Sequence, residues 1–253
     1  MARALDKEVF ALAVPALGAL AAEPLYVLVD TAIVGHLGTM QLASLAIAAT
    51  VLSTGFTLLN FLTYGTTAQV ARLHGAGRDR EAARLGSQAL WLAIGLGALL
   101  LVGTLALAPA AVRLMGGEDE VADGAVLYLR IAALGGPFFM LAAAAQGFLR
   151  GIGDLRTPLV ILVVAHVVNA VLEVLFVYGF GWGLAGSAWG TVIAQVGMGL
   201  AFVRVQWRAG LERPVLALMR PLMRIGAEIA VRTGALLGAF LVASAVLARV
   251  GST

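Results

Sequence analysis

The chain has 253 residues, of which 61% are hydrophobic and only 12% are charged. Soluble globular proteins contain about 45–50% apolar and about 25% charged residues, so this composition excludes an ordinary soluble domain. There is no cysteine, which excludes disulfides and thiolate metal sites, and the net charge of +3 is modest.

Seven apolar segments follow one another along the chain, each close to the ~20 residues needed to cross about 30 Å of hydrocarbon. Only helices and closed barrels satisfy the backbone in lipid, and these segments lack strict alternation, so we predict transmembrane helices. In chain order the segments are Val9–Gly35, Leu42–Ala68, Gln88–Pro109, Ala125–Leu149, Pro158–Tyr178, Leu184–Val205 and Ile225–Ala248. The expected fold class is an all-α polytopic membrane protein.

The first apolar segment follows Arg3, Asp6 and Lys7 and continues to Gly35. It is too long for the apolar region of a signal peptide, and no small-residue cleavage site ends it. We therefore interpret it as the first transmembrane helix.

Lysine and arginine are concentrated in alternate connections, which predicts orientation because basic loops stay in the cytoplasm. A cytoplasmic N-terminus places most basic residues inside: Arg3, Lys7, Arg72, Arg78, Arg80, Arg84, Arg150, Arg156, Arg204, Arg208, Arg213, Arg220 and Arg224. The outside then holds Arg113 and Arg249, with Arg130 near an outer helix end and the acidic loop around Glu118. We expect a multi-pass protein of the plasma membrane, of the bacterial inner-membrane type.

The longest polar connection, residues 204–224, is basic and contains Pro214 and Pro221. Six helices precede it and one follows. We therefore predict a six-helix lobe over residues 1–203, a cytoplasmic linker over 204–224, and the first helix of a second bundle over 225–253. An unpaired seventh helix indicates a partial chain.

Polar side chains recur within the apolar segments at helical spacing. The first segment has Glu23, Tyr26 and Asp30, the fifth has His166, Asn169 and Glu173, and the sixth has Thr191 and Gln195. Positions i, i+3 and i+7 share one face of a helix, so each set forms a polar stripe. Asn60 in the second segment is a further candidate for the same region.

We expect the three polar stripes to lie at the same depth below the outer membrane surface. Asp30 and Glu173 each come about six residues before an outer helix end, and Thr191 about seven residues after one, which places all three roughly 10 Å below the outer surface at 1.5 Å per residue. A common depth predicts a shared polar cavity near the middle of the lobe.

That cavity would be acidic, because the only lysine, Lys7, lies outside the apolar segments. Ionisable residues inside a bilayer are costly and usually functional, and burial and like charge both disfavour ionised carboxyls. Asp30 and Glu173 could therefore bind and release H⁺, or hold Na⁺ together with oxygens of Asn169 and Thr191. The alternative is that these side chains hydrogen-bond helices together, and for His166 we expect packing rather than proton relay.

Three strings of residues carry a family resemblance. They run from Glu23-Pro24-Leu25 through Val29-Asp30-Thr31 to Gly38, from Arg150-Gly151-Ile152-Gly153-Asp154 to Pro158, and from Asn169 through Glu173 to Gly186-Ser187-Ala188. In these strings the chain resembles the multidrug and toxic compound extrusion (MATE) family, in particular its DNA-damage-inducible F branch.

The resemblance implies twelve helices in two six-helix lobes, of which this chain would be the N-terminal lobe plus the first helix of the C-terminal lobe. It also implies a cation-coupling cluster at Tyr26, Asp30, Asn169, Glu173 and Thr191. Many family members have Asp where this chain has Glu173, a departure that bears on which ion is used.

The expected function is therefore a secondary antiporter that exports organic, often cationic, compounds in exchange for H⁺ or Na⁺. Two alternatives stay open: a flippase for a lipid-linked precursor, and a non-transporting membrane fragment. We expect no enzymatic activity, no cofactor beyond the coupling ion, and no nucleic-acid partner. The expected partners are small organic substrates, the lipid bilayer and the missing C-terminal lobe.

Overall fold

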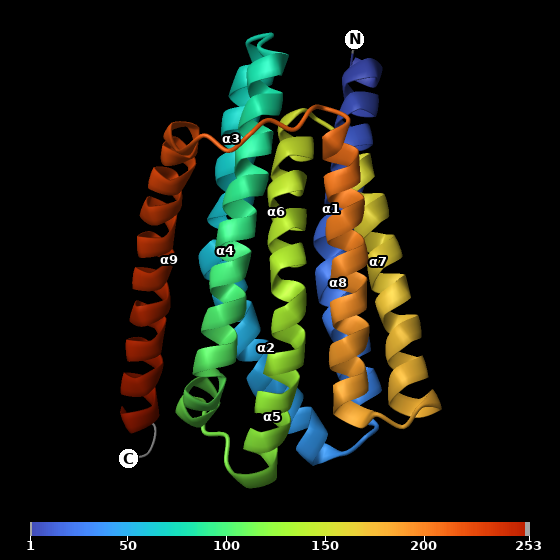
Figure 1. Ribbon diagram of the computed structural model, residues 1–253, viewed down its shortest axis with the longest axis vertical. Coiled ribbons are helices and arrows are strands. Elements are labelled where there is room, and N and C mark those ends of the chain that lie inside the picture. Colours follow the sequence, from blue (N-terminus) through green and yellow to red (C-terminus); the bar gives the residue numbers. More distant parts are fainter. Residues whose placement is uncertain (1, 251–253) are drawn as a thin grey trace.

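The computed structural model describes the backbone of residues 2–250, and the side chains of residues 14–239 except positions 15, 16, 19, 20, 23, 230 and 237. These residues form helices without any strand: α1 (Ala2–Gly35), α2 (Thr39–Leu59), α3 (Phe61–Gly75), α4 (Asp79–Leu114), α5 (Asp119–Ala132), η1 (Ala133–Gly135), α6 (Gly136–Gly151), α7 (Arg156–Val174), η2 (Leu175–Gly179), α8 (Gly183–Trp207) and α9 (Leu216–Val250). The helices run along the long axis of the molecule, with the connections at its two ends (Figure 1).

Within the described residues, five helical segments are long and apolar enough to cross a membrane, and the shorter apolar stretch Pro24–Gly35 ends α1. The five correspond to the second to sixth predicted segments. The first part of the first segment and the end of the seventh fall on residues whose side chains are not described. The predicted all-α polytopic class is confirmed.

Two predicted segments that we expected to be continuous are interrupted. The segment Leu42–Ala68 divides at Asn60 into α2 and α3, and the segment Ala125–Leu149 divides at η1. Pro137 explains the second break, because proline has no N–H to donate to the carbonyl of Ala133, four residues earlier, and a tighter turn replaces the α-helical one. Sequence hydropathy did not predict either break, because both sides remain apolar.

The connection before the last helix is shorter than the predicted linker 204–224. Helix α8 continues to Trp207 and α9 begins at Leu216, which leaves residues 208–215 between them. Pro214 lies in this connection, whereas Pro221 lies inside the first turns of α9. The error arose because basic residues at helix ends were assigned to the loop.

Small residues let the helices approach closely. A Cβ at Gly147 of α6 would lie 2.7 Å from the carbonyl oxygen of Thr63, and one at Gly97 of α4 would lie 2.6 Å from the Cα of Pro137. Without these side chains the backbones of α3, α4 and α6 can pack against one another, which is how helices associate in lipid. Phe148, Met140 and Phe202 fill the buried core between these helices and α8.

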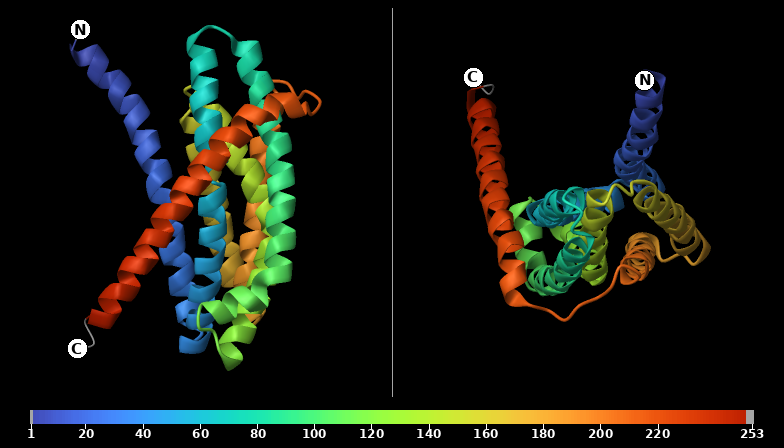
Figure 2. Two further views of the ribbon diagram at one scale, coloured as in Figure 1. Left: turned by 90° about the vertical axis from the view of Figure 1, so that its left-hand side faces the viewer. Right: turned by 90° about the horizontal axis from the view of Figure 1, so that it is seen from above.

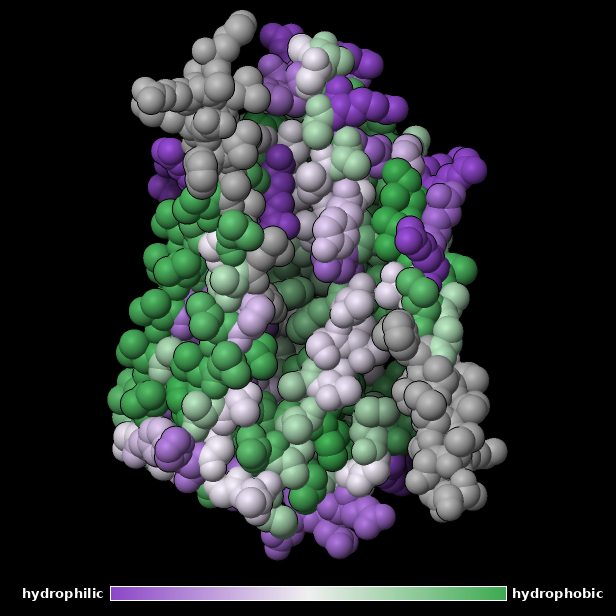
Figure 3. Space-filling view, turned by 180° about the vertical axis from the view of Figure 1, so that it is seen from behind, coloured by the Kyte–Doolittle hydropathy of each residue, from purple (hydrophilic) through white to green (hydrophobic). Residues whose placement is uncertain are grey.

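The bundle is open on one face. Figure 2 shows the first half of α1 and most of α9 leaning away from the other helices on the same side of the molecule. Seen from that side, the surface is hollowed near its middle, with hydrophobic and weakly polar residues around the hollow (Figure 3). The largest part of the polar side chains predicted to share a cavity lies in this open part of the bundle.

Candidate functional site

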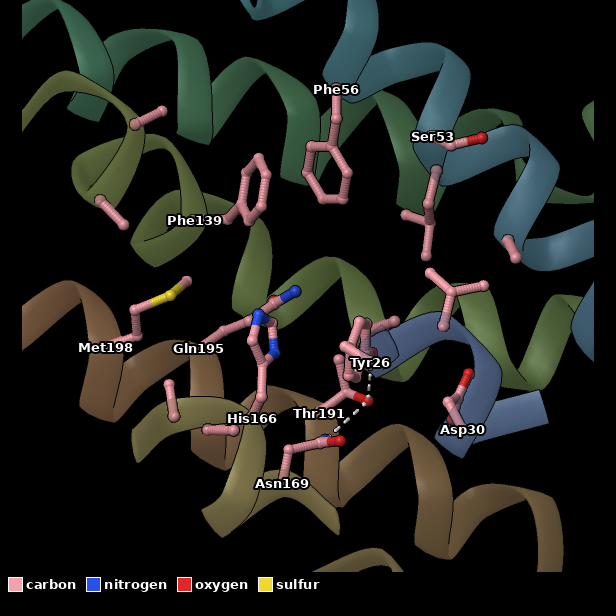
Figure 4. A pocket seen from close by; sticks show the side chains of 18 of the residues that line it. Tyr26, Asp30, Ser53, Phe56, Phe139, His166, Asn169, Thr191, Gln195 and Met198 are labelled. Carbon is pink, nitrogen blue, oxygen red and sulfur yellow. Dashed lines mark hydrogen bonds between the residues drawn. The ribbon is translucent and has the colours of Figure 1, made fainter. Parts of the chain in front are cut away.

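A cavity of about 640 Å³ lies between helices α1, α2, α3, α5, α6, α7 and α8. Most of its wall is apolar, and the rings of Phe56 of α2 and Phe139 of α6 pack against each other at a tilt, with centroids 4.1 Å apart. Figure 4 shows His166 and Gln195 beside these rings, with Tyr26 and Asp30 further along the wall. An apolar cavity with a few placed polar groups is the usual form of a small-molecule site.

At one end of the cavity, two carboxyl groups are joined through a hydroxyl group. Ser187 Oγ of α8 lies 3.1 Å from Asp30 Oδ1 of α1 and 2.5 Å from Glu173 Oε1 of α7. Glu173 and Ser187 are fully buried, and Asp30 is 7% exposed while still lining the cavity. The two carboxyl groups therefore form a buried pair that communicates with the cavity through Asp30.

A second set of hydrogen bonds lies beside this pair. Asn169 Nδ2 of α7 donates to Thr191 Oγ1 of α8 at 3.3 Å, and the hydroxyl of Tyr26 lies 3.4 Å from the same Thr191 oxygen (Figure 4). Helices α1, α7 and α8 are thus linked twice within about one helical turn. Among the described residues, neither Asp30 nor Glu173 forms an ion pair with a basic side chain.

The local sequence explains how these side chains meet. Asn169 and Glu173 are four residues apart on α7, and Ser187 and Thr191 are four apart on α8, so each pair lies on one helical face. Gly190 lies between the two α8 positions, and a Cβ there would lie 3.1 Å from Cγ of Glu173. Its missing side chain is what allows α8 to approach the acid.

The structure brings together the five residues of the predicted cluster, and it places the additional candidates with them. Tyr26 stacks on His166, while His166, Gln195 and Asn60 line the cavity. His166 Nε2 and Gln195 Oε1 are buried without a hydrogen-bond partner among the described residues. The side chain of Glu23 lies outside the described residues.

Sequence reasoning missed two members of the site. Ser187 continues the α8 stripe of Thr191 and Gln195 by one more turn, so its i, i+4 spacing was a signal that could have found it. Tyr128 of α5 is 3% exposed and faces Asp30 and Glu173. No other polar residue recurs at helical spacing with Tyr128, so its position depended on how α5 packs.

The oxygens gathered here suit either of two cations. The site offers carboxyl oxygens of Asp30 and Glu173, the amide oxygen of Asn169 and the hydroxyl oxygen of Thr191, which are hard ligands of the kind that alkali cations prefer. The Asn169 Oδ1 and Glu173 Oε2 atoms are buried without a hydrogen-bond partner in the described residues. The same carboxyl groups could instead carry H⁺.

Comparisons with known proteins give a consistent result. The MatE family model matches residues 15–175. The DNA damage-inducible protein F of Escherichia coli strain K12 is 34% identical over 86% of this chain and 51% of its own length. Protein DETOXIFICATION 44 of Arabidopsis thaliana, a chloroplastic protein, is 32% identical over 98% of this chain and 51% of its own.

Solved structures show the same likeness. An outward-facing conformation of a multidrug resistance MATE family transporter of the MOP superfamily superposes with a TM-score of 0.79 at 25% identity, covering 87% of this chain and 51% of that one. The chain spans about half the length of the curated relatives it matches. With a family model matching more than half of its residues, in a bundle of membrane-length helices, the chain belongs to the MATE family of multi-pass membrane transporters.

Proposed function

We propose that this chain forms the N-terminal lobe of a secondary antiporter that exports organic compounds in exchange for H⁺ or Na⁺. The observation that carries the proposal is the buried pair Asp30 and Glu173, which has no basic partner among the described residues and opens through Asp30 onto a cavity of about 640 Å³. A cation bound at the pair and a substrate bound in the cavity would both contact Asp30.

The sharing of Asp30 suggests how the two events are coupled. When Asp30 holds the cation, its charge is neutralised and it cannot attract a cationic substrate. When the cation leaves, the ionised Asp30 carboxylate can bind such a substrate at the cavity wall. Exchange of one for the other, with rocking of two lobes about the cavity, would give antiport.

In this proposal the lobes divide at the connection 208–215. Helices α1 to α8 form the first lobe, and α9 begins the second, which the relatives' length suggests is about as large as this one. The N-terminus and the connection would face the cytoplasm, because the basic connections gather at the end of the bundle that holds the N-terminus (Figure 1).

One observation favours the alternative of a lipid-linked precursor flippase. Arg150 of α6 lines the cavity, and its guanidinium donates to Gln146 Oε1 at 2.9 Å. An arginine is the side chain expected where phosphate is recognised. Arg150 is the one arginine or lysine among the described lining residues, so we rank export of organic cations first.

The test is transport by the two-lobe protein in proteoliposomes. We expect efflux of a fluorescent organic cation such as ethidium to start when an inward gradient of H⁺ or Na⁺ is imposed and to stop when an ionophore dissipates it. If the efflux rate does not depend on either gradient, and the protein instead moves a labelled polyprenyl phosphate across the bilayer, the flippase is the correct function.

A further inference from the structure

Ser187 makes contacts that a single hydroxyl group cannot satisfy if both neighbouring acids are ionised. Its Oγ is within hydrogen-bond distance of Asp30 and of Glu173. A serine hydroxyl has one proton to donate, and an ionised carboxylate can only accept. One contact can therefore be Ser187 donating, and the other requires a proton on the carboxyl group.

The surroundings of Glu173 point to the same conclusion. The residue is fully buried, and its second oxygen, Oε2, has no hydrogen-bond partner among the described residues. A buried ionised carboxylate with an unpartnered oxygen would lose its hydration without compensation. A neutral Glu173 that donates to Ser187, which in turn donates to ionised Asp30, satisfies both contacts.

Among the residues described, no other titratable group near the pair supplies the positive charge that two ionised carboxylates would need. Tyr26 on α1 and Tyr128 on α5 face the two carboxyl groups, and His166 on α7 lies behind the ring of Tyr26. Helix α8 contributes the hydroxyl of Ser187 to the pair, while its Thr191 hydroxyl contacts Tyr26 and Asn169, and no titratable side chain of α8 hydrogen-bonds to the pair. Within the described residues, the pair therefore has no cationic neighbour that would stabilise two negative charges.

We propose that Ser187 is a positioning residue of the coupling site, whose hydroxyl ties Asp30 and Glu173 into a pair that holds one proton. The proposal rests on the coupling function proposed above and makes H⁺ the ion that this arrangement carries. Because Asp30 lines the cavity and Glu173 does not, the proton leaves through the pair: Glu173 donates to Ser187, Ser187 donates to Asp30, and Asp30 releases the proton to a water in the cavity. Ser187 orders the pair by accepting from one acid and donating to the other.

Infrared difference spectroscopy of the purified two-lobe protein in nanodiscs tests this directly, because a protonated carboxyl has its own C=O stretch. We expect the wild type to show the band of one protonated carboxyl at neutral pH, and Glu173→Gln to remove it. Ser187→Ala, which nearly conserves volume, should move the band frequency and shift the pH at which the band is lost by about one unit. Ser187→Cys, with a weak S–H donor, should fall between the two.

A matched control is Ser44→Ala, because Ser44 is a buried serine of α2 outside the cavity lining whose hydroxyl donates only to backbone carbonyls. A band and pH profile in Ser187→Ala that match the wild type would overturn the positioning role. That outcome is distinguishable from failure of the coupling function, since Asp30→Asn would still abolish gradient-driven efflux. Sodium displacing the band at neutral pH would also overturn it, by making Na⁺ the bound ion.

A second, independent inference concerns the connection 208–215, which has no regular secondary structure over residues 210–215. Side chains of α4 form hydrogen bonds to the backbone of this connection. Ser87 Oγ accepts from Glu212 N at 2.8 Å and donates to Glu212 O at 3.1 Å, and Trp91 Nε1 donates to the same carbonyl at 2.9 Å. Gln88 donates to Arg213 O at 3.0 Å and accepts from Val215 N at 2.7 Å.

Ser87 and Gln88 are fully buried, so their polar groups have no access to water and are satisfied by this backbone alone. Breaking these contacts would leave buried polar groups unpaired, which is costly. We infer that α4 holds residues 212–215 as a fixed anchor, so that α9 can move relative to the first lobe only through the chain beyond Val215.

Amide hydrogen exchange tests the anchor residue by residue. The amides of Glu212 and Val215 should exchange at least tenfold more slowly than that of Arg213, which has no acceptor among the described residues. Gln88→Met should release Val215 and leave Glu212 protected, and Ser87→Ala should do the reverse. Equal rates at all three amides in the wild type would show that the connection is free.

Discussion

The ring of Tyr26 lies flat against that of His166, with centroids 4.8 Å apart and an interplanar angle of 20°. The stack joins α1 to α7 beside the carboxyl pair, and the Tyr26 hydroxyl also reaches Thr191 of α8. Tyr26 therefore makes two separate interactions: its ring packs on His166, and its hydroxyl lies within hydrogen-bond distance of Thr191. The stack covers one face of the His166 ring, and packing rather than proton relay stays our prediction for this residue.

Tyr26→Phe should keep the stack and remove only the hydroxyl. We expect a loss of at most about 1 kcal/mol in the free energy of unfolding, typical of one hydrogen bond. Tyr26→Ala should cost about 3 kcal/mol, because it removes the ring as well. Thermal or denaturant unfolding of the two variants in the same detergent measures both. Equal losses would mean that the ring contributes nothing.

Asp30→Asn keeps the size and most hydrogen bonding of the side chain but removes its charge and its proton. We expect it to abolish gradient-driven efflux by the two-lobe protein, with normal membrane insertion. Glu173→Gln should do the same or shift the pH profile, because two interacting carboxyl groups titrate as a pair. The control is Asp123→Asn, an exposed residue of α5 outside the cavity lining. Wild-type efflux in both the Asp30 and the Glu173 variant across the pH range would make these acids structural.

Gly190→Ala should separate α7 from α8 at the site. The new Cβ would lie 3.1 Å from Cγ and 3.2 Å from the backbone nitrogen of Glu173, contacts that require the helices to shift. We expect about 1–3 kcal/mol of destabilisation, as for overpacking elsewhere. Gly197→Ala on the same helix is the matched control, because a Cβ there meets nothing within 4 Å. It should be neutral or slightly stabilising, since alanine favours helix more than glycine does.

The proposed orientation can be checked with single cysteines, because the chain has none of its own. The exposed residues Arg80 and Glu118 can be replaced by cysteine; Arg80 lies in the first turn of α4, and Glu118 follows the opposite end of that helix. We expect a membrane-impermeant maleimide to label position 118 from outside intact cells and position 80 only after permeabilisation. Labelling in the opposite order would place the N-terminus outside.

The sequence alone determined the class of this protein and the identity of its buried acids. Long apolar segments have few uses outside a bilayer, and a carboxyl group inside one is costly enough to stand out. The spacing of Asn169 and Glu173 also determined that both lie on one face of a helix. These conclusions depend only on composition and on helical periodicity within a single segment.

The tertiary structure decided which helix each face meets. In lipid the outer surface is as apolar as the core, so hydropathy does not separate exposed Leu99 from fully buried Leu129. The meeting of Ser187 with Asp30 and Glu173 depends on close approach at Gly190, and the anchoring of residues 212–215 depends on two buried side chains far away in sequence. Such contacts follow from long-range packing, which periodicity within one helix does not encode.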